Sequence, residues 1–161
     1  MKKIIITGGL GYIGTELCKI YSGYSWNDKI TIIDNRFISE RVNQIRNWNM
    51  NFIQGDILDK DLINEHCKDA DIVHHLAGIT DVPRVKSEST FEKEKLIRKV
   101  AEEGTQNILD AISDECKIIM PSSHVVYEGL DSIKKNIKED EKTCPSLAYG
   151  KSKNINEKQL K

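Results

Sequence analysis

The sequence predicts an α/β protein with a doubly wound parallel sheet, in which helices cover both faces in three layers. Short apolar runs alternate along the chain with segments of helical periodicity, the pattern that βαβ units produce. A glycine-rich turn follows the first apolar run, and acidic residues, glycines or serines follow the later ones. Ligands bind outside the carboxyl ends of the strands in such sheets, so these turns are the candidate functional positions.

The expected strands are short and rich in β-branched residues, as in a sheet buried on both faces. They are Lys3–Thr7, Lys29–Asp34, Asn51–Gln54, Asp71–Leu76 and Lys117–Met120. Helices are expected after the glycine turn, from Asp59 to about Cys67, from Phe91 to about Ser113, and around Tyr149. The polar segment between Leu130 and Cys144 is expected to be a surface loop.

The length of 161 residues favours one domain spanning 1–161. With 24 basic and 25 acidic residues the net charge is -1, which argues against a nucleic-acid partner. No apolar run reaches the roughly 20 residues of a membrane span. The cysteines are widely spaced without a Cys-x-x-Cys pair, so we expect no metal site and a reducing, cytoplasmic location; they are Cys18, Cys67, Cys116 and Cys144.

The first turn has the spacing of a dinucleotide-binding site. Gly9-x-Gly11-x-x-Gly14 follows a strand and opens a helix, and Gly8 adds a further small residue. Glycines at these positions allow a tight turn, close approach of the backbone to a pyrophosphate, and close packing of helix on strand. The N-terminus of the helix offers free N–H groups to the phosphates. We therefore expect a Rossmann-type nucleotide site here.

Asp34 ends the second strand, about 20 residues after the last glycine, where an acid binds the ribose hydroxyls. The 2′-phosphate of NADP would be repelled by about 4 kcal/mol per charge at about 4 Å, so NAD is favoured. Arg36, two residues further on, could offset part of that repulsion. Asp56 could accept from the adenine amino group or could cap the following helix, and Ile57 could pack on the adenine ring.

Tyr149 and Lys153 have the spacing of a tyrosine base and its lysine partner. Four residues apart on a helix, they share one face. A free tyrosine has a pKa near 10, so a base that works near neutrality needs a cation beside it. Ser123 follows the fifth strand, which should lie next to the fourth, and its hydroxyl could hold a substrate oxygen.

Taken in order, these motifs resemble the NAD-dependent epimerase/dehydratase family, the extended short-chain dehydrogenases/reductases that act mainly on nucleotide sugars. They are Thr7-Gly8-x-x-Gly11-x-x-Gly14, Asp34-Asn35, Gly55-Asp56-Ile57, His75-Leu76-Ala77-Gly78, Gly104-Thr105-x-Asn107, Ser122-Ser123-x-x-Val126-Tyr127 and Tyr149-x-x-x-Lys153. The resemblance implies Ser123, Tyr149 and Lys153 as the catalytic residues. It implies a cofactor site made of Gly8, Gly11, Tyr12, Ile13, Gly14, Asp34, Asn35, Asp56, Ile57, Leu76, Ala77 and Gly78, with Tyr149 and Lys153 at its edge.

The sequence departs from the family pattern in three places. Family members are about twice as long, so the chain is expected to lack the C-terminal strands and substrate domain and to end inside the Tyr149 helix. Ala101 stands where the family often has asparagine. His124-Val125 stand where 4,6-dehydratases carry an acid pair after the catalytic hydroxyl residue, and Glu128 interrupts the usual Val-Tyr-Gly. The missing acids disfavour a dehydratase.

The leading hypothesis is an NAD-dependent epimerase or related oxidoreductase acting on a nucleotide sugar. A non-catalytic dinucleotide-binding module and an NADP-dependent reductase remain as alternatives. The resemblance also implies a homodimer in which the helices around Phe91–Ser113 and Tyr149 pair with their copies.

Overall fold

A computed structural model describes residues 1–24, 28–80, 90–130 and 136–161. These residues belong to two compact units, each described here by itself. The first unit is Met1–Gly78 with Gly104–Pro121, and the second is Ile79–Glu103 with Ser122–Lys161. None of the described helices is long and apolar enough to cross a membrane.

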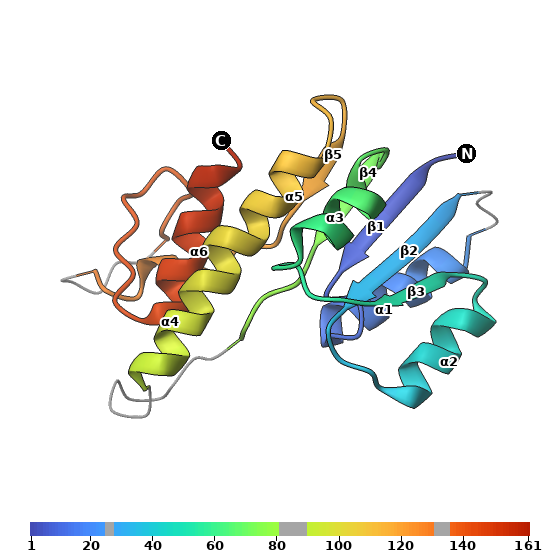
Figure 1. Cartoon of the computed structure of the whole chain (residues 1–161). Coiled ribbons are helices and arrows are strands. Elements are labelled where there is room, and N and C mark those ends of the chain that lie inside the picture. Colours follow the sequence, from blue (N-terminus) through green and yellow to red (C-terminus); the bar gives the residue numbers. More distant parts are fainter. Residues whose placement is uncertain (25–27, 81–89, 131–135) are drawn as a thin grey trace. The chain divides into compact units, whose positions relative to one another are not determined.

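The described part of the first unit holds the expected parallel sheet (Figure 1). Its strands are β1 (Lys3–Thr7), β2 (Lys29–Asp34), β3 (Asn51–Gln54), β4 (Ile72–His75) and β5 (Lys117–Ile119). Every neighbouring pair is parallel, in the order β3-β2-β1-β4-β5. The chain builds outward on one side of β1 and then on the other, so the ends of β1 and β4 form the switch point where such sheets bind ligands.

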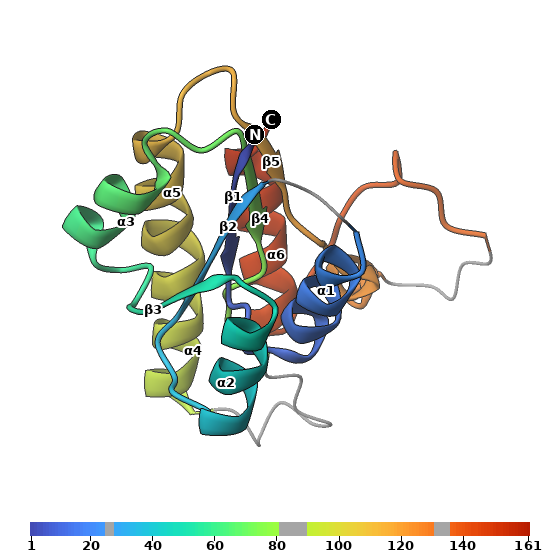
Figure 2. The same cartoon turned by 90° about the vertical axis from the view of Figure 1, so that its right-hand side faces the viewer.

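Helices cover both faces of this sheet (Figure 2). They are α1 (Tyr12–Ser22), α2 (Ser39–Asn47), α3 (Lys60–Cys67) and α5 (Thr105–Ala111). Helices α1 and α2 lie on one face, and α3 and α5 lie together on the other. Helix α2 was not expected, because most of its residues are polar and only Val42 and Ile45 are buried.

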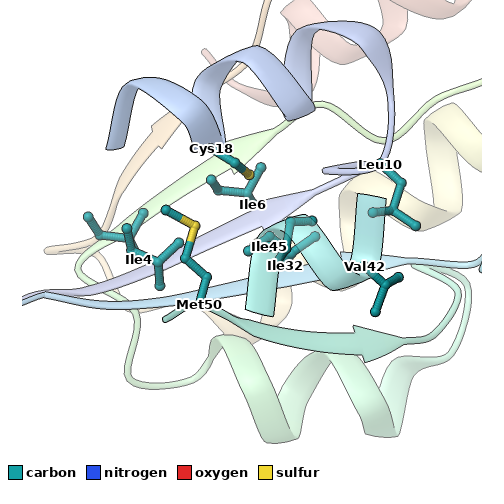
Figure 3. Packing of buried hydrophobic residues seen from close by; sticks show 9 residues of the cluster. Ile4, Ile6, Leu10, Cys18, Ile32, Val42, Ile45 and Met50 are labelled. Carbon is teal, nitrogen blue, oxygen red and sulfur yellow. The ribbon is translucent and has the colours of Figure 1, made fainter. Parts of the chain in front are cut away.

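The core between the sheet and helices α1 and α2 comes from alternate strand positions (Figure 3). Ile4 and Ile6 of β1 join Ile32 of β2 in this cluster, where they meet Cys18 of α1. Successive strand residues point to opposite faces, so Ile5, also fully buried, serves the other face. Burying each isoleucine contributes about 1.5–3 kcal/mol to the free energy of unfolding, which explains the continuous apolar runs in the sequence.

The described part of the second unit contains α4 (Phe91–Lys99), the short 3-10 helix η3 (His124–Tyr127) and α6 (Ala148–Gln159). Helix α6 packs against both α4 and η3. The single helix expected from Phe91 to about Ser113 is instead divided into α4, a π-helical segment at Val100–Gly104, and α5. Helix α6 ends at Gln159, before the last residues of the chain.

Side chains of α6 bind main-chain carbonyls of the π-helical segment. The Nδ2 group of buried Asn156 donates to the Ala101 carbonyl at 2.8 Å, and Nε2 of Gln159 donates to the Glu102 carbonyl at 2.9 Å. A buried carbonyl that lost such a donor would carry a desolvation penalty of about 1–3 kcal/mol. These bonds therefore tie the C-terminal turn of α6 to the π-helical segment.

Candidate functional site

The glycine turn lies between β1 and α1, and its backbone needs glycine. Gly8 has φ +69, and a Cβ there would lie 2.6 Å from the Ala77 nitrogen. At Gly14 a Cβ would lie 2.6 Å from the Cα of Gly9. Both distances are far below a normal contact, so side chains are excluded at these positions. The turn is thus packed directly onto the main chain that follows β4.

The N-terminus of α1 has the features of an anion site. Its N-cap is Gly11, in extended conformation, and the helix as described has no side-chain cap and no acidic residue in its first turn. The first N–H groups and the positive end of the helix dipole are therefore available to a phosphate. Tyr12 and Ile13, 84% and 59% exposed, stand at the same helix end. They line an open groove of about 430 Å³ together with Leu76 and Pro121.

A buried hydrogen-bond network joins the ends of β1 and β4. His75 Nδ1 lies 2.9 Å from the Thr7 hydroxyl, and its Nε2 lies 2.9 Å from the Thr105 hydroxyl on α5. The Leu76 amide donates to the Thr7 carbonyl at 3.0 Å, and the Ala77 amide donates to the Thr7 hydroxyl at 3.3 Å. The network places the expected Leu76–Gly78 segment beside the glycine turn.

Asp34 lies at the end of β2, as expected, and is 5% exposed. Its Oδ2 accepts the Leu10 amide at 3.0 Å, which ties the acid to the glycine turn. Arg36 also binds it, through Nε to Oδ1 at 3.1 Å and through Nη2 to Oδ2 at 3.2 Å. This hydrogen bonding raises the pKa of Arg36 further above its ordinary value. The pair is a two-point ion pair on a buried carboxylate.

Asp56 does not cap a helix, which corrects one of the two expected roles. The cap of α3 is Asp59, whose carboxylate accepts the Leu62 amide at 3.1 Å. Asp56 instead accepts from the Leu58 amide at 3.0 Å and from the Asn35 side chain at 3.0 Å. The last bond joins the residues that follow β2 and β3, so both expected cofactor residues lie at one end of the sheet.

Ile57 packs inside the first unit. Its side chain is 5% exposed and packs directly against Gly104. A Cβ at Gly104 would lie only 2.4 Å from Cδ1 of Ile57. The Asn107 side chain donates to the Ile57 carbonyl at 3.0 Å. The Gly104-Thr105-x-Asn107 motif therefore packs α5 onto the residue after Asp56.

In the second unit, α6 presents Tyr149 and Lys153 on one face. Lys153 Nζ lies 5.9 Å from the centre of the Tyr149 ring. Burial lowers the pKa of the Lys153 ammonium below its usual value. The helix is thus able to hold an ammonium close to the phenol ring, as the sequence predicts.

Ser123 is the N-cap of η3, and its hydroxyl accepts the Val125 amide at 3.5 Å. It lines a cavity of about 550 Å³ with His124 and Tyr127. The neighbouring Ser122 hydroxyl donates to the Glu157 carboxylate on α6. Ser122 therefore ties this loop to α6, and both serines line the same cavity.

Sequence reasoning missed two residues that position α6. Glu128 Oε1 accepts the Ser146 amide at 2.7 Å, the Ser146 hydroxyl at 2.9 Å and the Leu147 amide at 2.6 Å, so its carboxylate lies at the helix N-terminus. At Gly150 a Cβ would lie 2.7 Å from the Val125 carbonyl of η3. The motif Tyr-Gly-x-x-Lys includes Gly150, so the sequence held a signal for its close approach to η3. The role of Glu128 depends on a contact 18 residues away along the chain.

The sheet order, the glycine turn and the Tyr-Lys pair on one helix define a Rossmann-type protein of the extended short-chain dehydrogenase/reductase class. The sequence matches the 3-beta hydroxysteroid dehydrogenase/isomerase family over residues 5–161, and the chain belongs to that family. The membership expected from the motifs, in the NAD-dependent epimerases and dehydratases, is confirmed.

Two curated relatives are named as enzymes that act on nucleotide sugars. A UDP-N-acetyl-alpha-D-glucosaminuronate decarboxylase from Bacillus cytotoxicus is 32% identical over 78% of this chain and 38% of its own length. CDP-paratose 2-epimerase from Salmonella typhi is 28% identical over 92% of this chain and 44% of its own length. The chain thus spans less than half the length of these relatives.

Solved structures agree on the fold. UDP-glucose 4-epimerase from Brucella ovis, in complex with NAD, has a TM-score of 0.80 and 28% identity, covering 99% of this chain and 47% of its own. UDP-N-acetylglucosamine 4-epimerase from Methanobrevibacter ruminantium has a TM-score of 0.79 and 28% identity, covering 99% of this chain and 49% of its own. The likeness confirms the Rossmann-type fold and matches an N-terminal part of longer enzymes.

Proposed function

We propose that this chain is the cofactor-binding and base-bearing part of an NAD-dependent nucleotide-sugar epimerase or related oxidoreductase. The observation that carries the proposal is the placement of Lys153 Nζ 5.9 Å from the Tyr149 ring, on a helix of a chain that also has a dinucleotide-type glycine turn. Support comes from relatives whose names include nucleotide-sugar epimerases. The free cysteines among the described residues fit a cytoplasmic location.

The residues of the first unit fit NAD. The turn at Gly8–Gly14 offers uncapped N–H groups to a pyrophosphate, and the carboxylates of Asp34 and Asp56 stand at the ends of β2 and β3, where a nucleotide would lie. Two structural neighbours of at least 25% identity were crystallised with NAD. Bound NAD would supply the hydride acceptor at its nicotinamide ring.

In the second unit, Tyr149 is proposed to take the proton of a substrate hydroxyl at its phenol oxygen. The Lys153 ammonium, 5.9 Å from the centre of the Tyr149 ring, is proposed to stabilise the phenolate that accepts this proton. The Ser123 hydroxyl can both donate and accept, so it is proposed to hold the substrate oxygen during that transfer. An epimerase needs only this proton transfer with reversible hydride transfer.

The residues after Ser123 support an epimerase over a dehydratase. Removing water from a sugar needs an additional acid and base, and His124 and Val125 occupy the positions where dehydratases have them. His124 is exposed on η3. The structure of η3 therefore offers no carboxylate at those two positions.

The direct test is turnover of the longer natural protein with the substitution Tyr149→Phe. Positioned acid–base groups contribute about 10²–10⁴-fold, so the variant should lose at least about 100-fold in kcat while binding NAD as before. Tyr24→Phe is the matched control, since Tyr24 is an exposed tyrosine outside both η3 and α6. If Tyr149→Phe stays within about tenfold of wild type, the base assignment is wrong.

The two alternatives predict different results. A non-catalytic module would bind NAD without turnover of any nucleotide sugar, even as the longer natural protein. An NADP-dependent reductase would prefer the 2′-phosphorylated cofactor in binding titrations. Both measurements can be made on the same preparation.

We also propose a homodimer formed through α4 and α6. A groove of about 560 Å³ runs along these helices, and its walls include Phe91, Arg98, Lys151 and Ile155. Phe91 is 77% exposed although it is a large apolar side chain. Exposed apolar surface of this kind, bordered by charges, is typical of association sites.

A further inference from the structure

The carboxylate of Asp34 has its acceptor positions filled within the protein. Among the described residues, Oδ1 accepts the Arg36 amide and Nε, each at 3.1 Å. Oδ2 accepts the Leu10 amide at 3.0 Å and Arg36 Nη2 at 3.2 Å. An ionised carboxylate offers about four lone-pair positions, and these bonds use that number.

This arrangement changes what Asp34 can do for a nucleotide. A ribose with free 2′- and 3′-hydroxyls binds an acid by donating to it, so Arg36 would have to give up its side-chain bonds first. A ribose with a 2′-phosphate needs donors instead, and a guanidinium is a two-point donor suited to phosphate. The Arg36 side chain is 55% exposed and therefore reachable, whereas that of Asp34 is 3% exposed.

A second guanidinium contacts the same turn. Arg41 of α2 donates through Nη1 to the carbonyl of Leu10, the residue whose amide binds Asp34. Arg36 also lies at the turn, with Nη2 3.9 Å from where a Cβ of Gly11 would stand. Two positive charges thus lie at the turn beside the negative charge of Asp34, and their attraction for a 2′-phosphate opposes the expected repulsion.

We propose that Arg36, supported by Arg41, is a specificity-determining residue that lets this turn accept a 2′-phosphate, so that the site binds NADP as well as NAD. The inference rests on the proposed function, because it assigns the cofactor range of the same nucleotide site. The ligand chemistry is an adenosine 2′-phosphate on a 5′-diphosphate.

The test compares 5′-AMP with 2′,5′-ADP (adenosine 2′,5′-bisphosphate), which differ only by the 2′-phosphate, in calorimetric titrations of the 161-residue chain. These probes carry only the adenosine end of the cofactor, so the result depends on the first unit. Wild type should bind 2′,5′-ADP within about tenfold of 5′-AMP or more tightly. Arg36→Leu should weaken 2′,5′-ADP by about 10–100-fold, as expected for a lost charge-assisted hydrogen bond, and leave 5′-AMP unchanged or tighter.

Arg46→Leu is the matched control, because Arg46 is an exposed arginine of the nearby helix α2. It removes the same charge without touching Asp34, and should leave the ratio of the two affinities unchanged. If Arg36→Leu does not fold, Arg36→Gln takes its place. Glutamine keeps a hydrogen-bond donor without the charge, so this variant should also lower the preference for 2′,5′-ADP.

An unchanged ratio in the Arg36 variants, or an equal shift in Arg46→Leu, would overturn the inference. A wild type that binds 5′-AMP but is more than about 100-fold weaker for 2′,5′-ADP would overturn it as well. In each of these cases NAD binding would leave the proposed function intact. Failure of wild type to bind both NAD and 5′-AMP would instead overturn the proposed function.

Discussion

At the residue scale, Glu128 positions α6, the helix that holds Tyr149. Its carboxylate accepts two amides and a hydroxyl at the N-terminus of α6, where a negative charge also meets the positive end of the helix dipole. We expect Glu128→Ala to lower the free energy of unfolding by about 1–2 kcal/mol. Urea denaturation at neutral pH measures this change.

Glu128→Gln separates the charge from the hydrogen bonds. The amide keeps one acceptor oxygen, so this variant should lose less stability than Glu128→Ala. Glu65→Ala, an exposed glutamate on α3, is the control and should change the free energy of unfolding by under about 0.5 kcal/mol. Equal effects of Glu128→Ala and Glu65→Ala would contradict the capping role.

His74 gives the protein a pH dependence of a definite sign. It is 9% exposed, and its Nε2 lies 2.8 Å from the Tyr21 hydroxyl. Burial, with a smaller effect from Lys117, lowers its pKa below the ordinary 6.5. On acidification, His74 therefore takes up its proton at a higher pH in the unfolded chain than in the folded protein. Stability contributed by neutral His74 is present above about pH 6.5 and falls as the pH drops toward the folded pKa.

The measurement is urea unfolding at about pH 7.5 and about pH 5.5, for wild type and for His74→Gln. Glutamine keeps polar atoms near Tyr21 and does not titrate, so this variant should lose less stability on acidification than wild type. The difference is bounded by about 1.4 kcal/mol per pH unit for one proton. His124→Gln, at an exposed histidine, should behave as wild type. Parallel slopes for wild type and His74→Gln would argue against the assignment.

At the element scale, Gly150 decides how closely α6 approaches η3. Alanine is the better helix former by about 1 kcal/mol, so Gly150→Ala would stabilise an isolated helix. In this protein its Cβ would lie 2.7 Å from the Val125 carbonyl and 3.0 Å from the Pro145 Cβ. Since main chain cannot yield as a flexible side chain does, we expect net destabilisation by about 1–3 kcal/mol.

Thermal unfolding and NAD-dependent turnover of the longer natural protein both report on Gly150→Ala. Gly23→Ala is the control, because its φ is −78 and its nearest neighbour would lie at an ordinary 3.4 Å. That variant should unfold at or slightly above the wild-type temperature. A stabilised Gly150→Ala protein would show that α6 does not need this close approach.

β1 and β2 could be predicted from sequence because their runs are mainly apolar and, after the first residue, buried. β3 and β5 are short and only partly buried, so their apolar residues gave a weaker signal. β1, β2 and β3 have the expected bounds, while β4 and β5 are shorter than expected. Helix α2 could not be predicted, since burial of Val42 and Ile45 depends on the sheet beneath them. The π-helical segment was equally hidden, because the donors that satisfy its carbonyls belong to α6.

The candidate site was predictable where local spacing carries the geometry. The glycine turn and the Tyr149–Lys153 pair are short motifs whose form follows from adjacent residues. The contact of Glu128 with Ser146 was not, because it depends on how a loop returns to the start of α6. The sequence placed Arg36 near Asp34, but not the two-point pair that the two side chains form. Resemblance to a family therefore located the site but not the residues that tune it.

At the scale of the whole molecule, the exposed face of α4 and α6 predicts self-association. Phe91 is 77% exposed and Leu96 is 48% exposed, and burying a large apolar side chain contributes about 1.5–3 kcal/mol. The charged groove residues Glu94, Lys95 and Arg98 carry both signs, so a second copy turned about a twofold axis can place opposite charges together. We expect a dimer in sedimentation equilibrium at about 50 µM chain. At that concentration an association free energy of about 6 kcal/mol is enough to populate the dimer.

Phe91→Glu should shift this equilibrium at least tenfold toward monomer, because it places a charge where the apolar contact would form. Ile20→Glu is the control: Ile20 is 57% exposed, but it lies on α1 of the first unit. That variant should sediment as wild type does. A wild-type chain that remains monomeric up to about 500 µM would count against the interface, since its affinity would then fall below that of ordinary weak dimers. Equal dissociation by both variants would show instead that association uses apolar surface without regard to α4 and α6.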